Sequence, residues 1–116
     1  IFEKLEVEAP FCKYPTGGCI TYVELDATFV TNTKAVKQII DYAFDELDIP
    51  YLAFNFPIDT CLDCGYTAEF NNTCPECGSS NIEQLRRVTG YLTTDYRKFN
   101  EGKRAETRER VKHSRY

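Results

Sequence analysis

The 116-residue chain contains no methionine, no tryptophan and a single histidine. Because it begins at Ile1 and lacks methionine altogether, we expect it to be a piece of a longer protein. Long apolar runs are also missing, whereas a bilayer span needs about 20 consecutive apolar residues. No charged segment followed by an apolar one opens the chain. We therefore expect neither a membrane span nor a signal peptide, and we expect a cytoplasmic location.

The composition is that of one small globular domain, with 42% apolar, 14% aromatic and 28% charged residues. A chain of this size buries only about two-thirds of its unfolded surface. Residues 87–116 are too polar to enlarge the core. We therefore expect a bound metal or a larger partner to complete the fold.

The net charge of −4 conceals two segments of opposite charge. Residues 1–85 carry a charge of −10, and residues 86–116 carry +6. Such a division is typical of a basic tail that binds nucleic acid, or of a tail that docks on an acidic surface. Charge by itself leaves both possibilities open.

The first half of the chain predicts a β-α-β unit. Residues 20–25 alternate β-branched or aromatic residues with polar ones after a glycine pair, which predicts a strand. A helical pattern follows three capping candidates at 31–33 and ends at Pro50. After it, the apolar run 51–56 fits a short buried strand. The apolar residues of the helical pattern are Val36, Ile39, Ile40, Ala43, Phe44 and Leu47. We expect the two strands to be parallel and to belong to a larger sheet covered by helices.

Residues 58–82 contain two Cys-x-x-Cys-Gly motifs, with nine residues between Cys64 and Cys74. Glycine after each cysteine pair permits the positive-φ turn that points backbone N–H groups at the thiolates. Four thiolates match tetrahedral Zn²⁺ and leave no position for a bound water, so we predict a structural zinc ribbon. Its ligands are Cys61, Cys64, Cys74 and Cys77.

Two alternatives to zinc stay open at this point. Iron is one, because the two motifs resemble the knuckles of rubredoxins and a four-sulfur site suits either metal. The nine-residue separation is much shorter than in rubredoxins and favours a zinc-ribbon hairpin. Disulfides are the other alternative, but they require an oxidising compartment, which nothing in the sequence indicates.

Three further residues are candidates for chemistry. Cys12 and Cys19 lie near one another in sequence, with Lys13 as their one basic neighbour. Reactive cysteines need an electropositive, partly exposed setting, so we interpret both as buried packing thiols. His113 lies in a charged tail, where we expect a solvated side chain and no metal ligation.

The region after the cysteines predicts a strand that begins at Ile82 and is interrupted by a bend at Thr89-Gly90. A helix is predicted after Gly102. The segment 86–92 reads Arg-Arg-Val-Thr-Gly-Tyr-Leu, and residues 95–100 read Asp-Tyr-Arg-Lys-Phe-Asn. With the cysteine motifs before them, these segments resemble the glycyl-radical region of the anaerobic, class III ribonucleoside-triphosphate reductases. The resemblance spans nearly the whole chain.

The resemblance implies an α/β fragment with three parts. Residues 1–57 would be a β-α-β portion of a larger glycyl-radical α/β barrel, residues 58–82 a small four-cysteine zinc ribbon, and residues 83–116 the glycyl-radical loop with a basic C-terminal tail. Gly90 would carry the radical. Loss of a hydrogen from an α-carbon leaves a radical that requires this carbon to flatten, and only glycine flattens without a side-chain clash.

The resemblance also implies partners. In this family a 4Fe-4S activase that cleaves S-adenosylmethionine generates the radical on the glycine. The radical then passes to an active-site cysteine, which attacks the ribose of a ribonucleoside triphosphate. Neither Cys12 nor Cys19 matches that cysteine. The family further implies nucleotide effectors and a homodimer, with no direct nucleic-acid binding.

The alternative function is a non-catalytic zinc-ribbon module whose basic tail binds nucleic acid. The ribbon from Cys61 to Cys77 argues against it, because this segment holds three carboxylates and no lysine or arginine. In the reductase interpretation, the basic residues would dock the loop and tail on an acidic or phosphate-bearing surface, with a solvated basic face as the simpler interpretation. These residues are Arg86, Arg87, Arg97, Lys98, Lys103 and Arg104.

Overall fold

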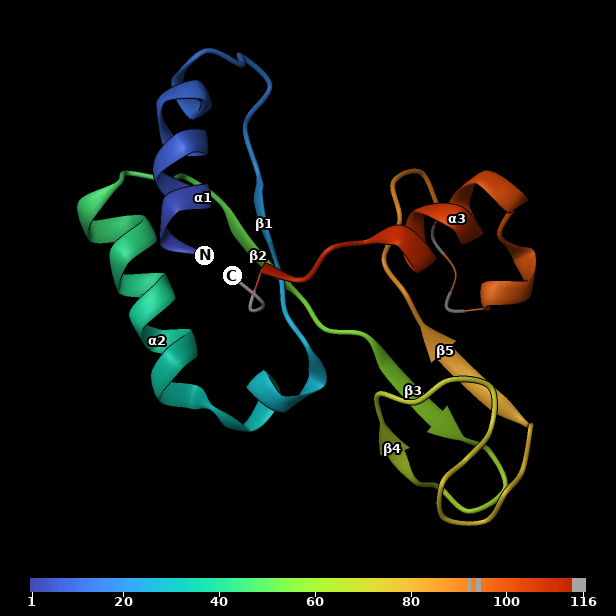
Figure 1. Cartoon of the computed structure of the whole chain (residues 1–116). Helices are drawn as coiled ribbons and strands as arrows, with labels where there is room; N and C mark the ends of the chain where they lie inside the picture. Colours follow the sequence, from blue (N-terminus) through green and yellow to red (C-terminus); the bar gives the residue numbers. More distant parts are fainter. Residues whose placement is uncertain (92, 94, 114–116) are drawn as a thin grey trace. The chain divides into compact units, whose positions relative to one another are not determined.

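The computed structural model describes residues 1–91, 93 and 95–113, and it divides into two compact units (Figure 1). One unit contains residues 1–55 together with Lys112 and His113, and the other contains residues 56–111. Within the described ranges, no helix has the length and apolar character that crossing a membrane requires.

The first unit is built on a parallel β-α-β arrangement. Strand β1 (Thr21–Glu24) pairs in parallel with strand β2 (Leu52–Asn55), and Thr21 lies opposite Leu52. This confirms the predicted pairing. Two helical segments precede β1 and were not predicted. In order, the elements are α1 (Phe2–Glu8), the 3-10 helix η1 (Ala9–Lys13), β1 (Thr21–Glu24), the 3-10 helix η2 (Ala27–Thr31), α2 (Thr33–Asp41), the π-helical turn η3 (Tyr42–Glu46) and β2 (Leu52–Asn55).

Helix α2 begins where the capping candidates predicted. The side chain of Asn32 accepts a hydrogen bond from the Ala35 N–H at 3.2 Å. The chain leaves the helix through Asp48, whose φ is +52°, before Pro50. Phe44 was expected on the apolar face but is 43% exposed. The buried apolar residues of this unit are Leu5, Val23, Leu25, Ile39, Ala43 and Ile49.

The free edge of β1 is covered by two side chains from distant parts of the chain. Lys4 of α1 donates to the Tyr22 carbonyl, and the Glu24 N–H donates to Nδ1 of His113 at 2.9 Å. The prediction of a solvated His113 is therefore wrong. The Glu24 N–H at the edge of β1 gives the imidazole a partner that no local pattern in the tail reveals.

The second unit contains an antiparallel sheet and a helical segment. The sheet has strand order β4-β3-β5, with β3 (Ile58–Cys61), β4 (Thr67–Ala68) and β5 (Ile82–Leu85). The 3-10 helix η4 (Tyr96–Lys98) and helix α3 (Glu101–Glu109) follow. The predicted strand at Ile82 and the turn at Thr89-Gly90 are confirmed. Helix α3 begins one residue before Gly102, because Asn100 caps the Lys103 N–H at 2.9 Å.

Candidate functional site

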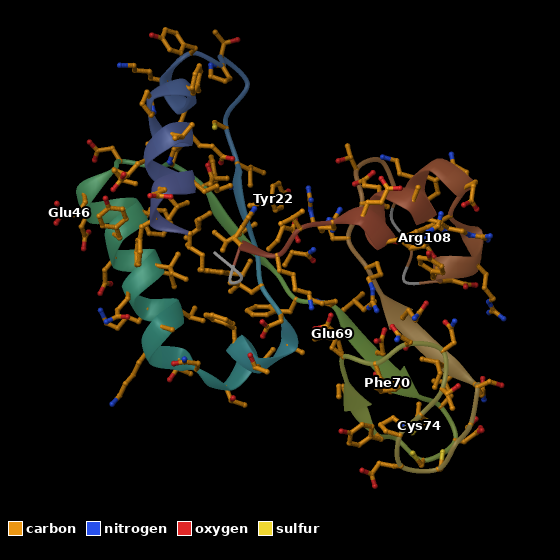
Figure 2. The ribbon with its side chains drawn as sticks, viewed as in Figure 1. Tyr22, Glu46, Glu69, Phe70, Cys74 and Arg108 are labelled. Atoms are coloured by element: carbon orange, nitrogen blue, oxygen red, sulfur yellow. The ribbon has the colours of Figure 1, made fainter. Side chains whose placement is uncertain are left out.

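The four predicted metal ligands lie together at one end of the ribbon sheet. Their Sγ atoms all lie within 4.8 Å of one another. Cys61 and Cys77 are separated by 3.5 Å between sulfurs, and Cys64 and Cys74 by 3.6 Å. Figure 2 shows sulfur atoms gathered around the labelled Cys74. A tetrahedral ion with Zn–S bonds of about 2.3 Å needs sulfurs about 3.8 Å apart, so the ligand set fits zinc.

Each pair of ligands is held by the same backbone turn. The Gly65 N–H donates to the Cys61 carbonyl at 2.9 Å, and the Gly78 N–H donates to the Cys74 carbonyl at 2.9 Å. The two glycines have φ values of +77° and +74°. This left-handed backbone is the reason that glycine follows each cysteine pair.

The thiols compete with one another for protons. Hydrogen bonds from the backbone N–H groups of Cys64 and Asp63 outweigh burial and lower the pKa of Cys61 to about 7. The Tyr66 N–H acts to lower the pKa of Cys64, but burial and hydrogen bonds with the other three thiols raise it to about 12. One thiolate is thus favoured at the expense of its neighbours. A divalent cation relieves this competition, because metal binding displaces the thiol protons.

Asp63 links the first cysteine turn, residues 61–65, to the segment that follows the second cysteine turn, residues 74–78. Its carboxylate accepts hydrogen bonds from the Ser79 hydroxyl and from Nδ2 of Asn81, the latter at 2.9 Å. The same two bonds, led by the one from Ser79, lower the pKa of the Asp63 carboxyl. This link therefore persists at neutral pH, where this carboxylate is charged.

A buried ion pair joins strands β3 and β5 just before the glycine loop. The Asp59 side chain is fully buried and lies 2.6 Å from Nη2 of Arg86, whose side chain is 17% exposed. The Phe70 N–H donates to the other carboxylate oxygen at 2.9 Å. Sequence reasoning assigned no role to Asp59, because no local pattern around it indicates a buried carboxylate.

Gly90 lies at the exposed tip of the loop that follows β5. Its φ is +85°, and among the described residues no heavy atom beyond the two chain neighbours lies within 4 Å of the position that a Cβ would take. Val88, before the tip, is buried, and Tyr91, after it, packs edge-on against buried Phe99 with ring centroids 5.2 Å apart. The tip is therefore open while both of its flanks are anchored. Leu92, the last residue of the predicted signature, lies outside the described residues.

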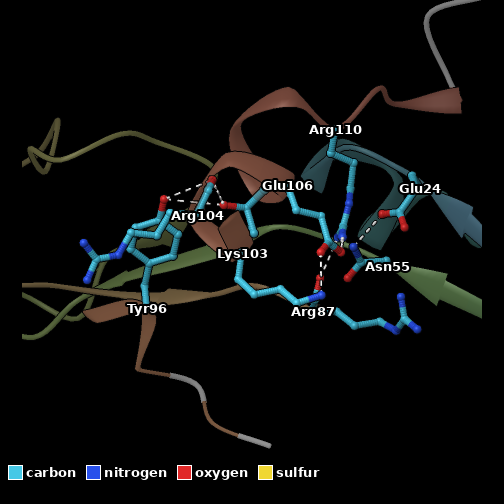
Figure 3. A network of polar contacts seen from close by, with 9 residues as sticks. Glu24, Asn55, Arg87, Tyr96, Lys103, Arg104, Glu106 and Arg110 are labelled. Carbon is cyan, nitrogen blue, oxygen red and sulfur yellow. Dashed lines mark hydrogen bonds and ion pairs between the residues drawn. The ribbon is translucent and has the colours of Figure 1, made fainter. Parts of the chain in front are cut away.

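A polar network fixes the backbone just before the loop (Figure 3). Arg110 donates to the Arg87 carbonyl at 2.7 Å and pairs with Glu106 at 3.0 Å. Lys103 pairs with the same carboxylate at 2.9 Å. The α3 segment thus holds the residue three positions before Gly90 through a chain of charge-assisted contacts.

Many of the basic side chains are engaged within their own unit. Arg97 pairs with Asp95 at 2.9 Å, and Arg108 pairs with Glu101 at 2.7 Å. Arg104 donates to the Arg97 carbonyl at 2.8 Å. With the pairs of Arg86, Lys103 and Arg110, these contacts engage many of the basic side chains, while residues 86–116 keep a net positive charge.

Cys12 and Cys19 differ from the sequence-based interpretation. Both are half-buried, and their Sγ atoms lie 2.7 Å apart. They are therefore not separate packing thiols within the core. The loop of six intervening residues folds back on itself, which the spacing alone does not determine.

Comparisons with known proteins address the family. A family model described as anaerobic ribonucleoside-triphosphate reductase matches residues 1–113. The chain is 40% identical over 121 aligned residues to the anaerobic ribonucleoside-triphosphate reductase of Escherichia coli strain K12, which covers 97% of this chain and 17% of that protein. The enzyme of the same name from Enterobacteria phage T4 is also 40% identical, over 97% of this chain and 20% of its own length.

A different protein shows a weaker similarity. The CRISPR-associated endodeoxyribonuclease Cas12f1 of Syntrophomonas palmitatica is 30% identical over 88 residues, which is 72% of this chain and 16% of that protein. This match is shorter and has lower sequence identity than the matches to the reductases. The chain spans about a fifth of the length of those reductases. The chain belongs to the anaerobic ribonucleoside-triphosphate reductase family.

Proposed function

We propose that the protein containing this chain is an oxidoreductase that converts ribonucleoside triphosphates to deoxyribonucleotides under anaerobic conditions. This chain would be its C-terminal portion and would carry the stable radical on Gly90. The observation that carries the proposal is the geometry of Gly90 in a chain of this family: an exposed loop tip with left-handed backbone and anchored flanks.

The chemistry of an α-carbon radical accounts for that geometry. The radical is stabilised when the α-carbon flattens between the donating amide nitrogen and the withdrawing carbonyl. A Cβ would oppose flattening and would also be strained at a φ of +85°. Because the tip is exposed, an S-adenosylmethionine-cleaving 4Fe-4S activase can reach the α-hydrogen. The anchored flanks hold the same residue in a defined position afterwards.

The cysteine cluster supports this role by fixing the base of the loop. Cys61, Cys64, Cys74 and Cys77 would hold a structural Zn²⁺, which supplies crosslinking of the two knuckles and no catalytic chemistry. The ribbon sheet that the four cysteines organise includes β5, and Arg86 follows β5 directly. The position of the loop therefore depends on the order of the ribbon.

The proposal extends to the rest of the protein. Residues 1–57 would be part of a glycyl-radical barrel, residues 58–82 the zinc ribbon, and residues 83–116 the radical loop and tail. Two parallel strands are normally part of a sheet buried on both faces, which supports a larger barrel. The activase, nucleotide substrates, nucleotide effectors and a second subunit would act on that larger protein.

The alternative, a zinc-ribbon module that binds nucleic acid without catalysis, has less support. Its basic tail would need free positive charge for phosphate contacts. Three of its basic side chains, Arg97, Lys103 and Arg108, pair with carboxylates of the same segment. The alternative also gives no role to the anchored glycine loop.

The test is electron paramagnetic resonance on the full-length protein after anaerobic incubation with the activase, S-adenosylmethionine and a reductant. We expect a radical signal in the wild type, no signal in Gly90→Ala, and an unchanged signal in Gly102→Ala. The Gly90 substitution should fold, because its Cβ meets open space and the strained backbone costs about 1 kcal/mol. A signal that survives in Gly90→Ala would contradict the proposal.

A further inference from the structure

The thiols of Cys12 and Cys19 meet across the loop that connects η1 to β1. The Sγ atoms of Cys12 and Cys19 lie 2.7 Å apart, which is closer than two unbonded sulfur atoms normally pack. Cys12 Sγ also lies 3.8 Å from the Glu8 carbonyl oxygen and 3.8 Å from Oγ1 of Thr21. The two thiols therefore face one another and are separate in sequence from the cysteines of the ribbon.

The backbone holds this arrangement from both sides. Cys12 belongs to η1, whose end is closed by the Tyr14 N–H donating to the Phe11 carbonyl at 3.1 Å. Cys19 lies two residues before Thr21, which is 1% exposed and whose N–H donates to the Tyr51 carbonyl at 2.9 Å. Gly18, with φ of +107°, makes the turn that returns the chain. The pair is therefore built into the fold of this unit.

The pair is also within reach of a small reagent. Both cysteines are half-buried, and every residue of the loop 13–18 is exposed. A short exposed loop over facing thiols allows a small disulfide to approach one sulfur while the other stays beside it. This arrangement differs from that of a thiol enclosed in an apolar core, which is inert.

We propose that Cys12 and Cys19 form a redox modification site, a dithiol that closes reversibly to an intramolecular disulfide by exchange with a low-molecular-weight disulfide such as oxidised glutathione. One protein thiolate attacks the glutathione disulfide and releases one glutathione thiolate. The second protein thiolate then attacks the mixed disulfide and releases the other. Two protein thiols lose two protons and two electrons, and one glutathione disulfide becomes two glutathione thiols.

The surroundings also determine the pH at which the exchange is fast. The hydrogen bond with Cys12, burial, and the negative charges of Cys12 and Glu8 raise the pKa of Cys19. The thiolate is the attacking species, so exchange accelerates as the pH rises toward that pKa. Closure would brace the loop of residues 12–19 at the start of β1, independently of the radical chemistry proposed above.

The test uses the full-length, zinc-loaded protein under anaerobic conditions in buffers of increasing ratio of oxidised to reduced glutathione. Free thiols are blocked with N-ethylmaleimide, and the protein is digested with trypsin. Trypsin cuts after Lys13, so Cys12 and Cys19 fall in separate peptides, residues 5–13 and 14–34. Only a bond between the two cysteines keeps these peptides together in the mass spectrum.

We expect the joined peptides in the wild type, and their separation when a thiol reductant is added before blocking. In Cys12→Ser and Cys19→Ser, the remaining thiol should acquire glutathione only at an oxidant ratio about tenfold higher, because it lacks a neighbouring thiol of high effective concentration. Separate peptides from oxidised wild-type protein, whether alkylated or carrying glutathione, would overturn the proposal. The wild-type result decides the matter even if a variant fails to fold.

Discussion

At the scale of single residues, Asp59 and Arg86 show how a buried charge can link the metal site to the glycine loop. The Asp59 carboxylate has no exposed surface, and its oxygens face Arg86 and the Phe70 N–H. Burial raises the pKa of this carboxyl, while the Phe70 N–H and the Arg86 guanidinium act in the opposite direction. Burial prevails, so the pKa of this carboxyl lies above its ordinary value, and its two partners offset only part of the burial cost.

Replacing Asp59 with asparagine should leave the Arg86 guanidinium buried without its counter-charge. Breaking a buried pair in this way destabilises the surrounding structure by about 3 kcal/mol. We expect that loss in the free energy of opening of β3 and β5, measured by native-state hydrogen exchange on the zinc-loaded protein. The matched control is Glu83→Gln, an exposed position on the same sheet, where the change should stay within about 0.5 kcal/mol. Equal effects of the two substitutions would refute this role of the pair.

At the scale of elements, the ribbon lacks an apolar core and relies on its metal ligands and a few polar contacts. Between residues 56 and 82, the fully buried side chains are Asp59, Cys61 and Cys74, and none of these is a large apolar residue. The β4 strand contains only two residues. A structural zinc ion supplies on the order of 10 kcal/mol of folding free energy in such sites. The three strands should therefore depend on the bound ion.

Removal of zinc with a chelator should unfold the ribbon and release the base of the Gly90 loop. We expect hydrogen-exchange protection to fall across residues 58–85 and to return when zinc is added back. Amides of β1 and α2, which belong to the other unit, should keep their protection and serve as the internal control. Unchanged protection in the ribbon after verified metal loss would show that the cysteines are not its main support.

The contact between the C-terminal tail and β1 should respond to pH. Burial first, and then the positive charge of Lys4, lower the pKa of His113 below its usual 6.5, while Glu24 acts to raise it. Nδ1 accepts the Glu24 N–H only when it is unprotonated. Because the pKa is depressed in the folded state, the stabilisation is complete above about pH 6.5 and is lost as the pH falls through the folded pKa.

Nuclear magnetic resonance or hydrogen exchange at the Glu24 amide measures this release. We expect its protection factor, corrected for the intrinsic pH dependence of exchange, to decrease between about pH 7 and pH 5. In His113→Ala, protection should be low at both values and insensitive to pH. A protection factor that stays constant in the wild type would rule out the contact as the source of pH sensitivity.

The elements also show what the sequence could reveal. Periodicity predicted β1, α2 and β2, because the buried residues Ile39 and Ala43 follow a helical repeat, and cysteine spacing predicted the ribbon. Helix α1 was missed because Leu5 is its only buried residue and no side chain caps its start. The contacts of His113, Asp59 and the Cys12–Cys19 pair depend on tertiary proximity, which no local pattern records.

At the scale of the whole molecule, the chain spans 17 to 20% of its reductase relatives, and the proposed reaction depends on groups outside it. Several large apolar side chains of the β-α-β unit are exposed, as the proposed larger barrel would require. They include Phe11, Tyr14, Ile20, Val30 and Tyr51. This chain would contribute the α-carbon of Gly90 and the ribbon sheet, organised by the metal, that holds this carbon in position.

The most direct test of a radical on Gly90 replaces the hydrogen atoms on the α-carbon of glycine with deuterium. The full-length protein is produced with ordinary glycine and with glycine deuterated at the α-carbon, activated anaerobically, and examined by electron paramagnetic resonance. A radical on Gly90 keeps one α-hydrogen, so we expect a two-line spectrum that collapses to a single line in the deuterated protein, with backbone cleavage at Gly90 when air is admitted. A spectrum unchanged by deuteration, or no radical in folded, zinc-loaded protein, would contradict the account.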